Sequence, residues 1–280
     1  MTRRTRSLIG NLGRYLGLIV FSLVLVFPLL WMISTSFKPG NEIFTKIPRW
    51  IPNQPTIENY RFMLLHTTYP VYYLNTLKVS IITTVFALVI SVFAGYSLSR
   101  FRFRGRGFLG VLIIAVQMFP YVLLVIPMFI VMRSMGLIDT HLSLIIAYST
   151  FALPFSTWML KGYFDTIPVS LEEAAIIDGC RRSQILFRII LPLSAPGLVA
   201  VAMFTFILGW REYIYALAFT RSEKLRLLTV GLALMQGQHG RISWGQIMSG
   251  AVLACIPAIL VFTILQKYMV QGFTRGAVKE

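Results

Sequence analysis

Residues 168–179 read Pro-Val-Ser-Leu-Glu-Glu-Ala-Ala-Ile-Ile-Asp-Gly, and this polar stretch stands between two long apolar runs of the chain. Ser170, with Glu173 three residues later, is typical of a capping box, in which two side chains bind the free backbone N–H groups at a helix start. Gly179 can adopt the left-handed turn that ends a helix. The pattern predicts a short helix, capped by Ser170, in a loop between two longer helices.

The composition of this predicted helix suits contact with another protein. Glu172, Glu173 and Asp178 would give it an acidic face, while Ala174 and Ala175 keep its middle small enough for close approach. We therefore expect the helix to dock into a cleft of a partner. The capping role of Glu173 needs no partner, so a purely structural interpretation of that residue stays open.

The rest of the chain is too apolar for a soluble domain. Hydrophobic residues make up 56% of its 280 residues, charged residues make up 13%, and the mean hydropathy is +0.73. About 20 apolar residues cross the ~30 Å hydrocarbon core of a bilayer as a helix. Six runs are near that length or longer, at 16–35, 74–99, 108–132, 142–160, 189–210 and 247–266.

These runs predict an all-α integral membrane protein with six transmembrane helices, both termini on one side, and a single membrane domain over residues 1–280. The fifth run is the weakest because Pro192 and Pro196 interrupt it.

The net charge of +16 is informative through its location. Fifteen of the 26 Lys and Arg residues fall in the two tails, the loop after the second run and the loop at about 161–188, which share one side of this topology. Cytoplasmic loops carry an excess of Lys and Arg, so that side is predicted to be cytoplasmic. The cluster from Arg100 to Arg106 lies beside two apolar runs, where anionic lipid headgroups are closer than any nucleic acid. We expect membrane lipid, and no nucleic acid, as a partner.

Several kinds of site are absent from the sequence. No glycine is followed by lysine, so the phosphate-binding loop G-x-x-x-x-G-K-[ST] does not occur. Only Glu212 of the ten acids lies near an apolar run, whereas ion-coupled carriers place carboxylates within their spans. Cys180 and Cys255 are far apart and the three histidines are scattered, so neither a disulfide nor a metal site is expected. Arg211 and Glu212 are interpreted as a structural ion pair at the membrane border, and a place in the substrate path stays open as the alternative.

The predicted short helix and the residues after it resemble the EAA signature of permease subunits of ATP-binding-cassette importers. The matching residues are Glu173, Ala174, Ala175, Gly179, Ile189, Leu191 and Pro192. The wider frame, from residues 136–140 through Leu153 and Pro154 to residues 272–279, resembles the carbohydrate-uptake branch of the maltose and maltodextrin type, and the stretch 210–213 adds to that likeness.

The resemblance implies the type I importer permease fold and a multi-pass subunit of the cytoplasmic (inner) membrane, which is not itself an enzyme. It implies import of a sugar, a di- or oligosaccharide, driven by ATP. The implied partners are a second homologous permease chain, two ATPase subunits that use ATP and Mg, and an extracytoplasmic sugar-binding protein; this chain would bind no cofactor. Import of another polar solute, such as a glycerol-phosphate ester, stays open, as do an ion-coupled secondary carrier and a membrane-bound assembly protein.

In that family the EAA loop, here at about 161–188, contacts the ATPase, and the C-terminal tail approaches it. The resemblance implies coupling through Ser170, Glu172, Glu173, Ala174, Ala175, Asp178, Gly179, Ile189, Leu191 and Pro192. It implies that the tail residues near the ATPase are Gly276, Ala277, Val278 and Lys279. Because sugars stack on aromatic faces and need amide partners, candidates for the substrate path are Gln117, Tyr121, Tyr148, Trp210 and Tyr213. Helix packing or a position in the interfacial aromatic belt explains them equally well.

Overall fold

The structure is a computed structural model, and every regular element in its described residues is helical. It describes the backbone of residues 3–235 and 243–277 and the side chains of residues 14–235 and 243–267. Packing divides the chain into two compact units, residues 1–70 with 232–255 and residues 71–231 with 256–280. The single membrane domain stays a prediction.

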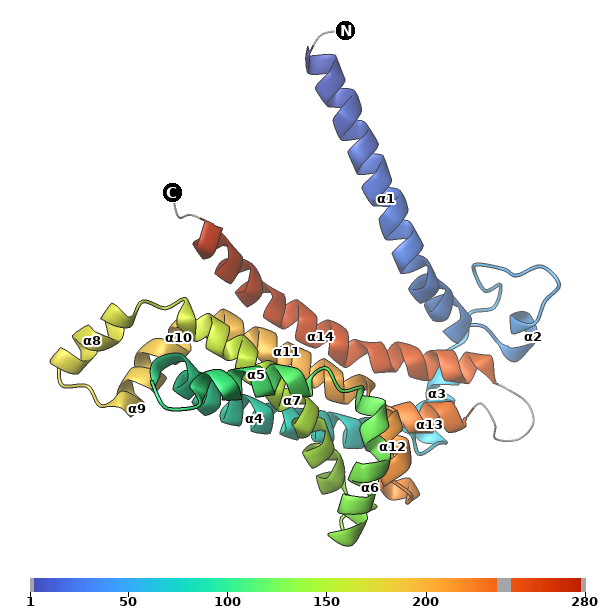
Figure 1. Cartoon of the computed structure of the whole chain (residues 1–280). Coiled ribbons are helices and arrows are strands. Elements are labelled where there is room, and N and C mark those ends of the chain that lie inside the picture. The colour runs from blue at the N-terminus through green and yellow to red at the C-terminus, as the bar shows by residue number, and fades with distance from the viewer. Residues whose placement is uncertain (1–2, 236–242, 278–280) are drawn as a thin grey trace. The chain divides into compact units, whose positions relative to one another are not determined.

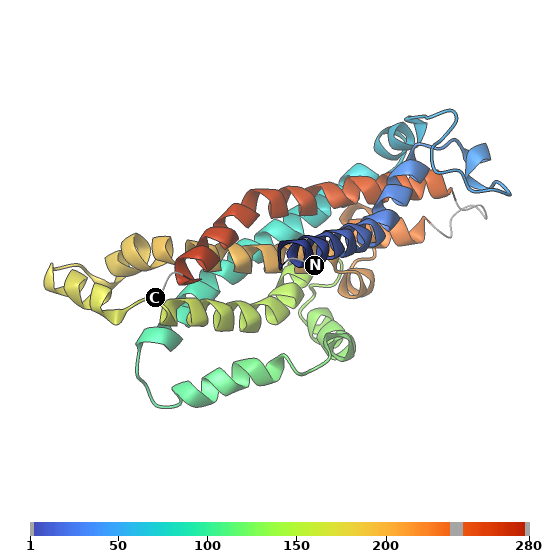
Figure 2. The same cartoon turned by 90° about the horizontal axis from the view of Figure 1, so that it is seen from above.

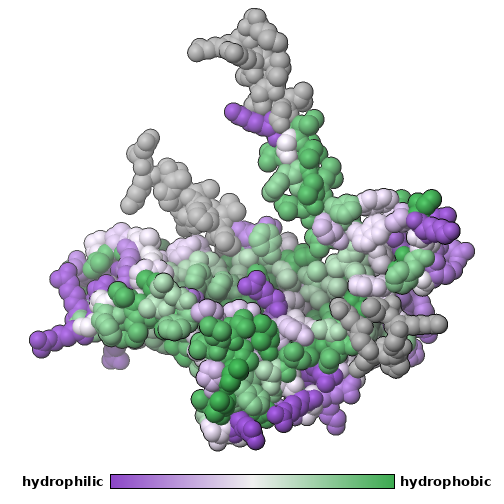
Figure 3. Space-filling view, turned by 45° about the vertical axis from the view of Figure 1, so that its right-hand side comes forward, coloured by the Kyte–Doolittle hydropathy of each residue, from purple (hydrophilic) through white to green (hydrophobic). Residues whose placement is uncertain are grey.

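The first unit holds α1 (Arg3–Ser36), α2 (Gly40–Ile43), α3 (Glu58–Leu65) and the beginning of α14 (Trp244–Ala277), as labelled in Figure 1. Side chains from residue 14 to residue 30 of α1 are all exposed, and Figure 3 shows a largely hydrophobic surface along this part of the helix. Such a surface suits lipid or another apolar helix. After α1, the side-chain amide of Asn59 holds the chain by donating to the carbonyls of Ser36 and Lys38, each at 2.9 Å.

The second unit is built around three long helices, α4 (Tyr69–Arg100), α7 (His141–Asp165) and α11 (Ala195–Arg211). They meet at small residues. Gly95 of α4 lies so close to α7 that a Cβ there would be 3.1 Å from the backbone nitrogen of Lys161. Gly197 of α11 lies against the ring of Tyr163, where a Cβ would be 2.4 Å from Cγ. Small residues permit this close approach, which holds helices together where the lipid is as apolar as the side chains.

Two of the six predicted spans are bent. α5 (Arg106–Val116) meets η1 (Tyr121–Leu124) and α6 (Val125–Ser134) at 92°, and α9 (Arg182–Ile185), η2 (Leu186–Ile190) and α10 (Leu191–Leu193) meet α11 at 78°. The span predicted over 108–132 is therefore broken at Pro120, which lacks a backbone N–H and disfavours helix in the residue before it. Among the described residues, four continuous helices and these two bent pairs make six candidate spans when each pair counts as one.

The two ends of the second unit carry different elements. α8 (Val169–Ile177) and α9 lie at the end where α4 and α7 finish, whereas α12 (Ile214–Phe219) lies towards the end where α11 finishes (Figures 1 and 2). η3 (Glu223–Leu225) and α13 (Leu228–Leu234) follow α12 in the chain. One buried hydrophobic cluster, which includes Tyr148 and Tyr215, packs near α12; another, which includes Phe164 and Ile190, supports α8.

Candidate functional site

The short helix predicted from the sequence is α8, but it starts two residues earlier than the capping box requires. Pro168 takes the N-cap position with φ −57° and ψ 130°, and no side chain caps the helix start. Ser170 is therefore the second residue of the helix, so the predicted capping box with Glu173 is wrong. The ring of Pro168 fixes φ near the helical value, and this lets the helix begin directly after it.

The predicted end of α8 is confirmed. Gly179 has φ +83°, the left-handed conformation that glycine adopts without a steric penalty. Two hydrogen bonds close this end, from Cys180 N to Ala175 O at 2.9 Å and from Gly179 N to Ile176 O at 3.0 Å. This pair of bonds is a Schellman motif, which satisfies the last carbonyls of the helix. It fixes the direction in which the chain leaves α8.

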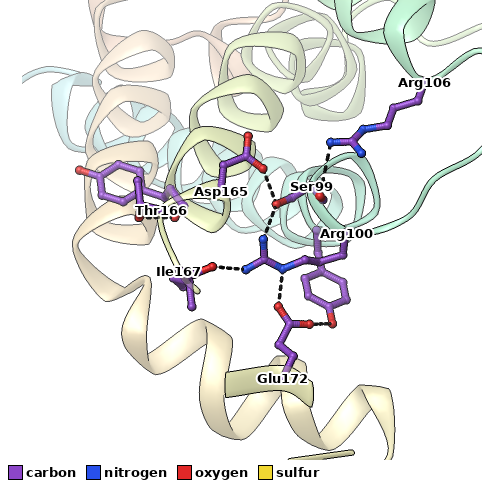
Figure 4. A network of polar contacts seen from close by, with 9 residues as sticks. Ser99, Arg100, Arg106, Asp165, Thr166, Ile167 and Glu172 are labelled. Atoms are coloured by element: carbon purple, nitrogen blue, oxygen red, sulfur yellow. Dashed lines mark hydrogen bonds and ion pairs between the residues drawn. The ribbon is translucent and has the colours of Figure 1, made fainter. Parts of the chain in front are cut away.

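Glu172 points into the protein and not towards a partner, as Figure 4 shows. Its carboxylate pairs with Nε of Arg100 at the end of α4, and the two side chains are only 5% and 6% exposed. The Tyr96 hydroxyl, one turn earlier on α4, donates to the other carboxylate oxygen at 2.8 Å. The prediction that Glu172 belongs to an acidic docking face is therefore wrong. The buried Arg100 requires a counter-charge, and Glu172 supplies it.

Arg100 joins three elements at this point (Figure 4). Besides the ion pair to α8, its Nη2 donates to the carbonyl of Ile167, between α7 and α8, at 2.9 Å. Its Nη1 lies 3.1 Å from the Ser99 hydroxyl, which itself donates to Asp165 Oδ1 at 2.6 Å. We call Tyr96, Ser99, Arg100, Asp165 and Glu172 the α8 anchor. The anchor attaches α8 to the ends of α4 and α7.

Several side chains of α8 are exposed and apolar. Val169, Leu171, Ile176 and Ile177 are 52%, 45%, 46% and 86% exposed, and we call these four residues the exposed apolar residues of α8. At 3.6 residues per turn they lie around the helix and not on one side of it. Exposed on the same short helix are Ser170, Glu173 and Ala174, and Asp178 follows them, whereas Ala175 is 7% exposed. Exposed apolar groups beside polar ones are typical of protein contact sites.

The remaining residues predicted to take part in coupling lie elsewhere. Ile189 and Leu191 pack against the buried cluster beneath α8, and Pro192 is exposed in α10. In the C-terminal tail, Gly276 and Ala277 close α14, and no side chain is described there. Val278 and Lys279 lie outside the described residues.

A cavity of about 680 Å³ lies where α5, η1, α7, α11 and α12 approach one another. Three residues predicted for the substrate path, Gln117, Tyr121 and Tyr213, line it. The other two do not. Tyr148 is fully buried and donates its hydroxyl proton to Glu212 at 2.8 Å, and the ring of the buried Trp210 packs against Tyr73 and Phe206.

Arg211 and Glu212 both line the cavity, but they do not form the predicted ion pair. The carboxylate of Glu212 accepts the backbone N–H groups of Tyr215 at 2.9 Å and Ala216 at 3.0 Å, which lie in the first turn of α12. This arrangement gives α12 a charged cap, and the positive end of the helix favours the carboxylate there. Glu212 therefore binds the start of α12 and not Arg211.

Two features of the site were not predicted. Arg100 was assigned to the lipid-facing arginine cluster, and the sequence contains no periodic signal that connects it to a residue 72 positions later. Four aromatic residues of the cavity, Phe119, Phe151, Phe204 and Tyr215, were not named because isolated aromatic residues in apolar helices are common. The break at Pro120 was the available signal for a cavity beside them.

Comparisons with known proteins agree with these features. Residues 87–275 match the family model for the binding-protein-dependent transport system inner membrane component. The trehalose/maltose transport system permease MalG of Thermococcus litoralis is 37% identical over 94% of this chain and 95% of its own. The diacetylchitobiose uptake system permease DasC of Streptomyces coelicolor is 36% identical over 98% and 99% of the two chains.

Among solved structures, a chain from the crystal structure of a bacterial ABC transporter that imports the acidic polysaccharide alginate superposes with a TM-score of 0.83 at 26% identity, over 96% of this chain and 98% of that one. Both the family model and the relatives cover far more than half of the sequence. This chain belongs to the family of binding-protein-dependent transport system inner membrane components.

Proposed function

We propose that this chain is the permease subunit of an ATP-binding-cassette importer for a saccharide, and that α8 receives the motion of the ATPase. The observation that carries the proposal is the combination at α8 of the buried ion pair Arg100–Glu172 and four exposed apolar residues. A partner that binds the exposed apolar residues of α8 can move this helix only together with the ends of α4 and α7. The cavity belongs to the same unit and is lined, among others, by Phe151 of α7 and Arg211 of α11.

In this mechanism an ATPase subunit contacts the exposed apolar residues of α8 together with Glu173 and Asp178. Closure of two ATPase subunits on ATP shifts α8, and the Arg100–Glu172 pair carries the shift to α4. The close contact between Gly197 and Tyr163 carries it from α7 to α11. The bend before α11 and the one at Pro120 allow the helix ends around the cavity to reorient. ATP hydrolysis on the partner subunits resets the arrangement.

The proposal places α8 and both chain termini in the cytoplasm, in agreement with the fifteen basic residues assigned to that side. A second, homologous permease chain would complete the path, and an extracytoplasmic binding protein would deliver the solute. The relatives, which are transport permeases for trehalose/maltose and for diacetylchitobiose, support a di- or oligosaccharide. The aromatic walls of the cavity suit stacking against sugar rings.

The hydrogen bonds of the Glu212 carboxylate argue against an ion-coupled carrier. Its carboxylate oxygens already accept two backbone N–H groups and one tyrosine hydroxyl. These contacts leave neither oxygen free to coordinate a co-transported ion. They favour a partner subunit as the source of energy for transport.

The test uses the complex that co-purifies with this chain, reconstituted in proteoliposomes. We expect ATP-dependent saccharide accumulation, and we expect Glu173→Lys and Gly179→Val to reduce it sharply while membrane insertion stays normal. Valine in the left-handed conformation of Gly179 costs roughly 1–2 kcal/mol and redirects the chain after α8. Gly179→Asn, which tolerates that conformation, and Glu58→Lys, on an exposed residue of α3, are the matched controls.

Normal uptake by both variants at wild-type ATPase rates would refute coupling through α8. Accumulation that follows an ion gradient in the absence of ATP would refute the importer itself. ATP hydrolysis that continues without uptake in the variants is the result that the mechanism requires.

A further inference from the structure

The cavity contains a cation with no partner in the described part of the chain. Arg211 is the last residue of α11, lines the cavity and is exposed. Among the described residues, its side chain forms neither a hydrogen bond nor an ion pair, in contrast to the buried Arg100. Ionisable residues in or beside membrane spans are costly and mark substrate paths or ion paths. The guanidinium of Arg211 is therefore available to a ligand.

The carboxylate next to Arg211 does not neutralise it. Both oxygens of Glu212 are used by Tyr148, Tyr215 and Ala216, which direct that group towards α12. Glu212 still places a negative charge near the cavity, so a bound anion has to be held by the direct hydrogen bonds of a guanidinium. Arg offers two parallel donors that match a carboxylate, sulfonate or phosphate group.

The shape of the cavity suits a solute better than a flat protein contact. Its volume of about 680 Å³ lies within the ~300–1,000 Å³ of typical small-molecule sites. Aromatic rings form much of the wall, from Phe119, Tyr121, Phe151, Phe204, Tyr213 and Tyr215. The amide of Gln117 stands at the same wall, where its nitrogen donates to the carbonyl of Phe151 at 3.2 Å and its oxygen can face a ligand. Aromatic surface, one amide and one cation suit a sugar that carries an anionic group.

We propose that this cavity binds the imported solute, that the solute is an anionic sugar or sugar ester, and that Arg211 recognises its anionic group. The inference rests on the import function proposed above and narrows its substrate class. Arg211 sets specificity, while the aromatic wall contributes binding that neutral and anionic sugars share. A carboxylated sugar and a phosphate ester present the same chemistry to Arg211, and the experiment separates them.

The experiment uses proteoliposomes of the co-purified complex and a defined solute mixture. The mixture holds matched pairs that differ in one anionic group, namely maltose with maltobiouronate, cellobiose with cellobiouronate, and glycerol with glycerol 3-phosphate. Mass spectrometry measures the ATP-dependent accumulation of each. The variants are Arg211→Gln, Arg211→Lys and the control Arg133→Gln, which removes an exposed arginine of α6 that does not line the cavity.

We expect the anionic member of a pair to accumulate in preference to the neutral one. Because one charge-assisted contact is lost, Arg211→Gln should lower uptake of that member by about tenfold or more at limiting concentration. Uptake of the neutral member should change less than twofold, Arg211→Lys should keep part of the preference, and Arg133→Gln should keep all of it. Preference for a uronate or for glycerol 3-phosphate tells which anionic group the site takes.

Three outcomes overturn the inference. Preferred uptake of neutral members, or an equal loss for both members in Arg211→Gln, removes the charge-recognition role. Failure of Arg211→Gln to co-purify with the second permease chain would assign the arginine to a contact between chains. If no solute accumulates with ATP in the wild-type complex, the proposed import function itself fails, and this inference fails with it.

Discussion

Removing the carboxylate of Glu172 tests whether α8 is attached to the membrane helices as the structure indicates. Glu172→Ala leaves the guanidinium of Arg100, which is 6% exposed, with a carbonyl and a hydroxyl in place of a counter-charge. It also leaves the Tyr96 hydroxyl without its acceptor. Both groups that lose a partner belong to α4, next to its contact with α8.

The expected size of the effect follows from burial. Breaking a buried ion pair by removing one partner typically costs ~3–5 kcal/mol, because the remaining charge is left uncompensated. A loss of ~3 kcal/mol corresponds to roughly a hundredfold increase in the fraction of time that a segment is detached. The exposed pair between Lys161 and Asp165, at 21% and 40% exposure, provides the scale for comparison. Such i,i+4 surface pairs contribute about 0.5 kcal/mol or less.

The assay is amide hydrogen exchange of residues 171–177 with the chain held in lipid nanodiscs. Glu172→Ala should speed exchange across α8 by roughly a hundredfold, and Lys161→Ala should change it by less than threefold. The double variant Arg100→Met with Glu172→Met removes both charges and keeps similar volume. It should recover at least half of the loss, because replacing a buried pair with apolar residues is often close to neutral.

Two results would refute this reasoning. Exchange of α8 in Glu172→Ala within threefold of the wild type would mean that the pair does not hold the helix. A loss in the double variant equal to the sum of the losses in Arg100→Met alone and Glu172→Met alone would mean that Arg100 and Glu172 are not coupled.

Two further predictions concern the contacts that hold the second unit together. Gly197→Ala should lower the thermal unfolding midpoint of the chain in detergent, because the added Cβ meets the Tyr163 ring at 2.4 Å and overpacking costs ~1–3 kcal/mol. Gly162→Ala, with open space around it, should raise the midpoint or leave it unchanged. Equal shifts in the two variants would contradict the packing argument. Hydrogen bonds from the hydroxyl and backbone N–H of Ser222 hold the pKa of Asp139 below its ordinary value of 3.8. The stabilisation by this carboxylate is therefore present at neutral pH and is lost as the pH falls through the lowered pKa. Protease cleavage near Arg221 should increase on acidification below about pH 4, and Asp139→Asn should show no such step.

The elements that could be predicted from the sequence are those with a strong local signal. The long apolar runs became α1, α4, α7 and α14, because about 20 residues without charge have few stable arrangements outside a membrane span. Gly179 ended α8 as predicted, because the positive φ of that turn depends on the residue itself.

The predictions that failed depended on competition between neighbours. Ser170 was a good N-cap in isolation, but Pro168 starts the helix two residues earlier and takes that position. The span over 108–132 was predicted without its bend of 92°, which lies at Pro120. Beside this break the side-chain amide of Gln117 donates to Phe151 O, 34 residues away, and a local pattern does not contain such a contact.

The charge pattern indicated which loops share one side of the membrane, but it predicted the wrong partners for Arg100 and Glu212. The cluster from Arg100 to Arg106 was assigned to lipid headgroups as a group, although Arg100 turns inward to Glu172. Adjacent Arg211 and Glu212 were paired with each other, although Glu212 caps α12. In both cases the charged group binds a buried side chain or backbone N–H groups and not the nearest opposite charge in the sequence. Fixed hydrogen bonds inside the protein stabilise a charge more than a flexible, exposed ion pair does.

These two corrections change which residues are free to contact other molecules. With Glu172 committed to Arg100, the acids left at the exposed side of α8 are Glu173 and Asp178, and the apolar residues dominate that surface. With Glu212 committed to α12, Arg211 is left free in the cavity. The buried carboxylate of Glu172 thus attaches α8 at one end of the unit, and the half-buried carboxylate of Glu212 caps α12 at the other end and leaves Arg211 without an ion partner among the described residues.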